Sequence, residues 1–110
     1  EDMMPLAASL ILLLAATPSA DAVGMGRKDF AKCLSAQVQP ALDRKMPLGD
    51  FQSALKQACA DKQSAFRAAL IAQGKADGLS DTQANADADE QIAEYVDKIT
   101  SEYEENSQPG

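Results

Sequence analysis

Apolar residues along this chain recur at helical spacing. After residue 22, no stretch alternates apolar and polar residues with the period of two that a half-buried strand requires, and β-branched residues are sparse. Apolar residues instead recur at intervals of three and four, which places them on one side of a helix. The pattern therefore predicts an all-α fold.

The first predicted helix carries one apolar stripe and a proline within it. Because Pro40 lacks a backbone N–H and disfavours helical geometry at the residue before it, we expect a kink or break there. A short connection follows at residues 46–49. The stripe consists of Phe30, Cys33, Leu34, Val38, Ala41 and Leu42.

The second predicted helix covers residues 50–73. Asp50 is a candidate N-cap, because its carboxylate can accept from free amides of the first turn, and Gly74 is a candidate stop. Lys62 is the one charged residue on the expected buried face and can extend its ammonium to solvent. This face consists of Phe51, Leu55, Ala58, Cys59, Lys62, Phe66, Ala69 and Leu70.

The third predicted helix, over residues 80–105, has the clearest local start signal. Ser80 and Gln83 have the spacing of a capping box, with Leu79 and Ala84 placed as its hydrophobic staple. The apolar face consists of Ala84, Ala88, Ile92, Tyr95, Val96, Ile99 and Tyr103. Short connections favour antiparallel neighbours. We therefore expect a three-helix antiparallel bundle over residues 23–106, followed by a disordered tail at 107–110.

Residues 1–22 have the features of a secretory signal peptide. The run Leu6 to Ala16 is apolar except for Ser9, and is shorter than the roughly 20 residues that span a bilayer. Ala20-Asp21-Ala22 supplies a small-x-small cleavage pattern. No Lys or Arg precedes the run, so an uncleaved anchor or an apolar tail remains as an alternative. We expect export to the periplasm or the extracellular space, without stable membrane insertion after cleavage.

The two cysteines favour a structural cross-link. Cys33 and Cys59 do not form a CxxC motif, and the chain has no His, which argues against redox catalysis and against a zinc site. In an oxidising compartment two thiols tend to pair. We therefore predict a disulfide between the first two helices; two buried free thiols are the alternative if the chain is not exported.

Charge is divided along the sequence. The formal net charge is −7, which argues against a nucleic-acid partner. Residues 27–75 hold nine basic and four acidic residues, whereas residues 76–110 hold ten acidic residues and one lysine. We expect the acidic third helix to lean on the basic pair; a solvated acidic face is the alternative. The available cations are Arg27, Lys28, Lys32, Lys56, Lys62 and Arg67.

Catalytic and metal-binding motifs lack essential parts. There is no His to activate a nucleophile, no G-x-S-x-G and no phosphate-binding Gly-rich loop. Asn85, Asp87 and Asp89 alternate like the opening of a calcium loop, but Glu90 and Val96 stand where that loop needs Gly and Glu. We expect this stretch to be helical, and we expect no catalytic residue, cofactor or metal.

Four large side chains of the third helix form a candidate interaction stripe. Packing in the core is the alternative role, and the one we favour, because a small domain has few large side chains to spare. The stripe consists of Ile92, Tyr95, Ile99 and Tyr103.

A short segment resembles a known family. Gln57-Ala58-Cys59, Asp61-Lys62-Gln63 and Ala65-Phe66 are similar to the stretch around the second cysteine of the HdeA-type periplasmic acid-stress chaperones. Proteins of that family are small, exported, helical and held by one disulfide. The resemblance covers residues 57–66 and implies the same class of protein.

Three functional hypotheses follow. The first is an exported, non-enzymatic helical protein that acts as an interaction or structural protein, with an unidentified protein as partner. The second is a periplasmic holdase-type chaperone that exposes apolar helix faces when acid protonates the third helix. The third, a small enzyme, has the least support.

Overall fold

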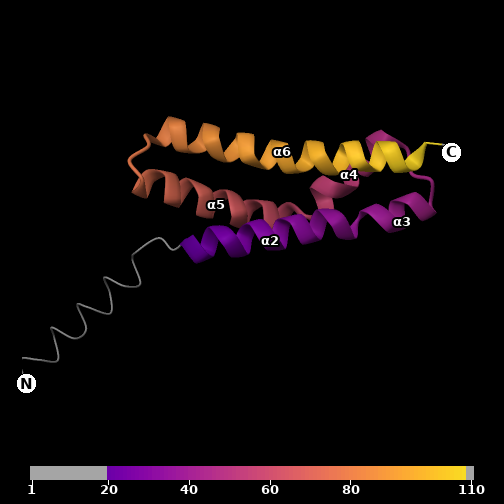
Figure 1. The fold of residues 1–110 in the computed structure, drawn as a ribbon, viewed down its shortest axis with the longest axis horizontal. Helices are drawn as coiled ribbons and strands as arrows, with labels where there is room; N and C mark the ends of the chain where they lie inside the picture. Colours follow the sequence, from indigo (N-terminus) through magenta and orange to yellow (C-terminus); the bar gives the residue numbers. More distant parts are fainter. Residues whose placement is uncertain (1–19, 109–110) are drawn as a thin grey trace, which may run out of the picture.

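A computed structural model describes residues 20–108, and this part of the chain is helical with short connections. Figure 1 shows three rods side by side: α2 continues into α3, α4 and α5 return along them, and α6 runs the length of both. The predicted all-α fold is confirmed. The helices are α2 (Ala20–Ala36), α3 (Val38–Asp43), α4 (Leu48–Ala58), α5 (Ala60–Ala76) and α6 (Asp81–Ser107).

The first rod is broken near its proline, as predicted. The interruption lies at Gln37, whose N–H donates to the Leu34 carbonyl, three residues back, at 3.1 Å. Pro40 has no N–H for the carbonyl of Ala36, and its ring crowds that carbonyl. The helix is therefore interrupted one turn before the proline.

The prediction of one continuous helix over residues 50–73 is wrong. α4 begins at Leu48 with Pro47 as its N-cap, so Asp50 lies in the first turn and does not cap. The rod is interrupted at Cys59, with φ −109° and ψ 14°. Both parts pack on a ring of α6, through Phe51 and Phe66, and Phe66 also packs against a ring of α2.

The stop of the second rod is Gly78, and the prediction of Gly74 is wrong. Gly78 has φ 101°, which glycine adopts without steric cost. The Leu79 N–H donates to the Gly74 carbonyl at 2.9 Å, and the Gly78 N–H donates to the Lys75 carbonyl at 3.0 Å. These two bonds form a Schellman motif, which satisfies the last carbonyls of the helix.

Gly74 lies inside α5 and allows a close approach of α6. A Cβ at this position would lie 3.3 Å from the Cβ of Ala84 and 3.2 Å from Cδ1 of Leu79.

The predicted capping box at the start of α6 is confirmed. Ser80 Oγ accepts from the Gln83 N–H at 3.1 Å, and Gln83 Oε1 accepts from the Ser80 N–H at 3.2 Å.

One aromatic ring from each rod meets at the centre of the bundle. Phe30 of α2 lies 5.9 Å from Phe66 of α5, centroid to centroid, and Tyr95 of α6 is edge-on to both. The Arg27 guanidinium lies 5.4 Å from the centre of the Phe66 ring and donates to the Tyr95 hydroxyl at 3.3 Å. Gly26 brings α2 close here, because a Cβ on it would lie 3.0 Å from Phe66 Cα.

A second aromatic contact holds the other end of the bundle. The rings of Phe51 and Tyr103 stack with centroids 3.9 Å apart. The Tyr103 hydroxyl donates to the Met46 carbonyl at 2.6 Å, with a longer contact to the Ala41 carbonyl at 3.3 Å. This buried hydroxyl therefore ties α6 to the connection between α3 and α4.

The predicted apolar faces are buried or half-buried, apart from Ala58 and Lys62, which are exposed. The predicted disulfide is also confirmed, since Cys33 and Cys59 are joined at an S–S distance of 2.12 Å. Cys59 is 1% exposed, so the cross-link attaches α2 to the interruption between α4 and α5.

The signal-peptide prediction falls mainly on residues outside the described part. Its last three residues, 20–22, form the start of α2, and cleavage after Ala22 stays a prediction. At the other end α6 continues to Ser107, into the predicted tail. Among residues 20–108, no helix has the length and apolar character needed to cross a membrane.

Reduction of the disulfide is expected to destabilise the bundle strongly. The bond joins residues 26 positions apart, and closing a loop of that length in the unfolded chain corresponds to about 3.5 kcal/mol in the chain-entropy model. Urea unfolding of the oxidised and the reduced chain measures the difference directly. A Cys33→Ala, Cys59→Ala variant should resemble the reduced chain, and a loss below about 1 kcal/mol would contradict this role.

Candidate functional site

A groove of about 620 Å³ lies between the second rod and α6. Its lining comes from α2, α4, α5 and α6, so the groove exists only in the assembled bundle. Four apolar side chains, Leu34, Leu55, Ile92 and Val96, contribute to this lining. The remaining lining residues are Gln52, Lys56, Ala60, Gln63, Ser64, Asp89, Ala93 and Asp97.

The groove runs past the interruption at Cys59. Lys56 of α4 and Ala60 of α5 line it from the two sides of the interruption, and Val96 lines it from α6. Cys59 itself is held in the core by its bond to Cys33. The disulfide therefore attaches this part of the second rod to α2.

The lining combines an apolar floor with polar edges. Leu34 and Leu55 are each 2% exposed and Ile92 is 7% exposed, while Val96 is half-buried. The exposed residues of the lining include Lys56 on one edge and Asp97 on the other. Such a site can accept apolar side chains at its floor and pair charges or hydrogen bonds at its edges.

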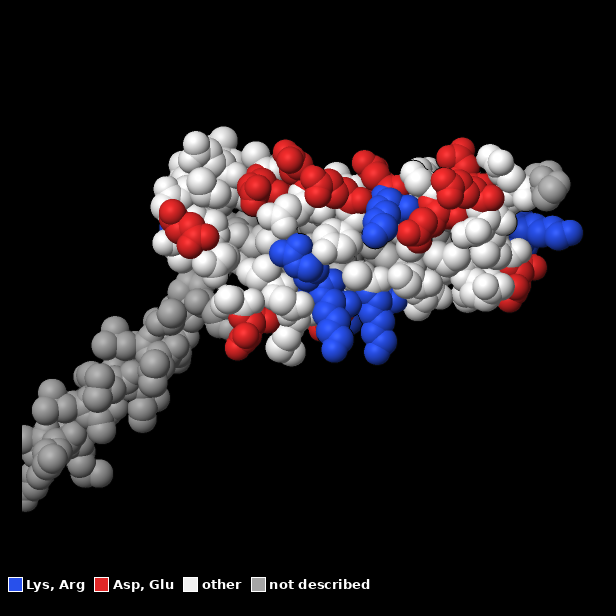
Figure 2. All heavy atoms as spheres, in the orientation of Figure 1, with Lys and Arg blue, Asp and Glu red and all other residues white. Residues whose placement is uncertain are grey.

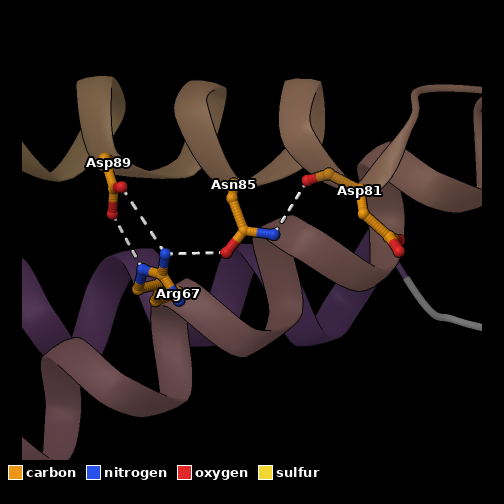
Figure 3. A network of polar contacts seen from close by, with 4 residues as sticks. All are labelled: Arg67, Asp81, Asn85 and Asp89. Carbon is orange, nitrogen blue, oxygen red and sulfur yellow. Dashed lines mark hydrogen bonds and ion pairs between the residues drawn. The ribbon is translucent and has the colours of Figure 1, made fainter.

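One end of the groove is fixed by an arginine from α5. Figure 3 shows Arg67 pointing toward Asn85 and Asp89 of α6. Arg67 Nε donates to Asp89 Oδ1 and Nη2 donates to Asn85 Oδ1, both at 2.8 Å. Asn85 Nδ2 in turn donates to the backbone carbonyl of Asp81 at 2.8 Å. Because residues four apart share one helix face, a single guanidinium holds two side chains of α6.

The ion pair shifts the pKa of both partners. The hydrogen bond from Arg67 lowers the pKa of Asp89 below its ordinary value, and the same bond raises the pKa of Arg67. Burial opposes each shift but is the smaller effect. Asp89, an edge residue of the groove, therefore stays charged to lower pH than an isolated carboxyl.

The division of charge is visible on the surface. In Figure 2 acidic side chains follow the upper edge of the bundle, along α6, and basic side chains gather below it. Between residues 20 and 108, two ion pairs join α5 to α6: Arg67 with Asp89, and Lys75 with Asp81 at 2.9 Å. Arg67 was among the expected cations and Lys75 was not. Arg27 instead contacts the rings of the central cluster.

The predicted interaction stripe lies mostly in the core. Ile92, Ile99 and Tyr103 are buried, and Tyr95 is half-buried in the central aromatic cluster. All four residues therefore pack in or beside the core. Ile92 is the one of the four that also lines the groove, so the predicted contact with a partner would involve Ile92.

The stretch with calcium-like spacing is helical, as predicted. Asn85 and Asp89 belong to α6 and face Arg67. Two oxygens of this stretch, four residues apart on one helix face, thus bind one guanidinium across the α5–α6 interface.

Sequence reasoning missed the groove. The sequence predicts only that Leu34, Leu55 and Val96 lie on apolar faces. They belong to three separate helices, and the packing of the rods brings them to one groove. The interruption at Cys59 is not marked by a Gly or Pro either.

Comparison with protein-family models, with curated proteins and with solved structures gives no match. The groove and the charges around it are the features of residues 20–108 that bear on function.

Replacement of Asp89 tests the ion pair. An Asp89→Asn variant should unfold at a slightly lower urea concentration than the parent at neutral pH. Because the pKa of Asp89 is lowered in the folded chain, the advantage of the parent should be present above the ordinary carboxyl range and disappear as the pH falls through the lowered pKa.

A Glu102→Gln variant is the control, since Glu102 is exposed on the same helix. A difference between the parent and the Asp89→Asn variant that persists at about pH 2 would show that its cause is not ionic.

Proposed function

We propose that this chain is an exported, non-enzymatic helical protein that binds a segment of another polypeptide in the groove between its second rod and α6. The groove carries this proposal, because it combines an apolar floor with exposed polar edges. The floor supplies area for apolar side chains, and the edges supply hydrogen bonds and charges that orient a bound segment.

The scaffold around the groove supports a binding role. One wall, α6, is held to α5 at the Gly74–Ala84 approach and by Arg67. The opposite wall is attached to α2 by the disulfide. A site with both walls held in place loses little conformational freedom when a ligand binds.

Export is part of the same proposal. The apolar run at residues 6–16 has the length of a signal-peptide core, and the disulfide is of the kind that persists in an oxidising compartment. A partner would therefore be met in the periplasm or outside the cell.

A pair of matched variants tests the groove. Ala93 is exposed and lines the groove, whereas Ala65 is exposed on α5 and does not line it. Tryptophan at residue 93 should occupy the groove without entering the core. Peptides selected from a random library against the oxidised parent should bind the Ala93→Trp variant at least about tenfold more weakly and the Ala65→Trp variant unchanged.

Equal binding to the parent and to the Ala93→Trp variant would place the interaction elsewhere. Circular dichroism and the urea midpoint of both variants establish that they are folded. An exposed Ala→Trp change within a helix should cost under about 1 kcal/mol.

An acid-stress holdase is the second candidate function. Both ion pairs that join α5 to α6 depend on carboxylates of α6, and one of these, Asp89, stands at the groove. Protonation would remove both attractions and free this wall of the groove. The local resemblance at residues 57–66 points to the same class.

Titration with an apolar-surface dye distinguishes the two candidates. A holdase should bind the dye increasingly as the pH is lowered from about 7 to about 2, while its near-ultraviolet circular dichroism falls. A chain that keeps its near-ultraviolet signal and binds no dye at about pH 2 is not an acid-activated holdase.

A further inference from the structure

The two edges of the groove differ in charge. The edge formed by α4 and α5 carries one cation, Lys56, among neutral polar residues. The edge formed by α6 carries Asp89 and Asp97, one on each side of Ala93. Arg67 already pairs with Asp89, whereas Asp97 is exposed and has no ion pair with any residue between 20 and 108.

The surroundings of the α6 edge strengthen its negative potential. α6 contains nine acidic residues and one lysine, and acidic side chains follow the α6 edge of the molecule in Figure 2. Exposed charges of one sign attract an oppositely charged ligand over roughly a Debye length, about 8–10 Å at moderate salt. A ligand approaching the groove beside α6 therefore meets an attractive field only if it is basic.

The length of the groove defines the form of the ligand. From Asp89 to Asp97 the α6 edge extends over eight residue steps, about 12 Å or just over two helical turns. The apolar floor includes Leu55, Ile92 and Val96. A segment of that length offers two apolar side chains three or four positions apart, which is how an amphipathic helix fills an apolar groove.

We propose that the groove binds a short basic amphipathic helix of a partner protein, with its apolar face on the floor and a Lys or Arg beside Asp97. This inference rests on the proposed function and specifies the chemistry of the partner. Lys56 on the opposite edge repels cations, so the basic side chains of the bound helix face α6.

Two synthetic peptides test the charge preference. They share one apolar pattern of leucines three and four positions apart, and their polar positions are filled with Lys and Arg in one and with Glu in the other. The cationic peptide should bind the oxidised chain at least about tenfold more tightly than the anionic peptide. Its affinity should fall as salt is raised from about 0.05 M to about 0.5 M.

Charge-reversal variants locate the contact. The Asp97→Lys variant should bind the cationic peptide at least about threefold more weakly than the parent, because an attraction at the edge becomes a repulsion. The control is Glu102→Lys, the same change in charge at an exposed position of α6 that does not line the groove. Its effect should be smaller than that of Asp97→Lys.

Each result separates this inference from the proposed function. If the anionic peptide binds as well as the cationic one, and the Ala93→Trp variant abolishes both interactions, the groove binds polypeptides but the basic preference is wrong. If the Asp97→Lys and Glu102→Lys variants lose the same affinity for the cationic peptide, the attraction comes from α6 as a whole, and the placement of the contact at Asp97 is wrong. If neither peptide binds and library selection also yields no peptide sensitive to Ala93→Trp, both proposals fail.

Discussion

The covalent bond between Cys33 and Cys59 is the constraint on which the arrangement of the bundle depends. It fixes α2 to the one place where the second rod is interrupted, so that α4 and α5 meet at a point anchored in the core. Both parts pack on α6, and α5 also packs on α2. α4 follows the carboxyl-terminal half of α6, and α5 fits between α2 and α6. The groove lies between the second rod and α6. The cross-link thus joins α2 to the rod that forms one wall of the candidate binding site.

The packing is divided into two centres with different chemistry. At the middle of the bundle, Phe30, Phe66 and Tyr95 meet without forming a parallel stack, and an arginine closes the cluster. Near the carboxyl end of α6, Phe51 and Tyr103 stack in parallel. Edge-to-face and stacked ring pairs each add roughly 0.5–1.5 kcal/mol beyond the area that they bury. With few large side chains available, the chain uses aromatic rings where its rods must be held in register, and glycine where two backbones must come close.

The start of α6 and the pairing of the two cysteines were predicted correctly, whereas the end and the interruption of the second rod were not. The capping box of Ser80 and Gln83 depends on residues three apart, so the sequence alone was sufficient to identify it. The choice between Gly74 and Gly78 depends on which one adopts a positive φ, and apolar spacing does not report this. The interruption at Cys59 carries no Gly or Pro that would mark it in the sequence. The groove could not be predicted either, because its walls come from segments far apart in sequence.

The two tyrosines have a consequence for observing this molecule in solution. The chain contains no tryptophan, so its near-ultraviolet absorption comes chiefly from Tyr95 and Tyr103. Tyr95 belongs to the central cluster beside an arginine, whereas Tyr103 donates its hydroxyl to the Met46 carbonyl near one end. Replacing either tyrosine by phenylalanine leaves a single phenolic reporter, one for each region. The loosening of the two regions can then be timed separately, without attaching a label.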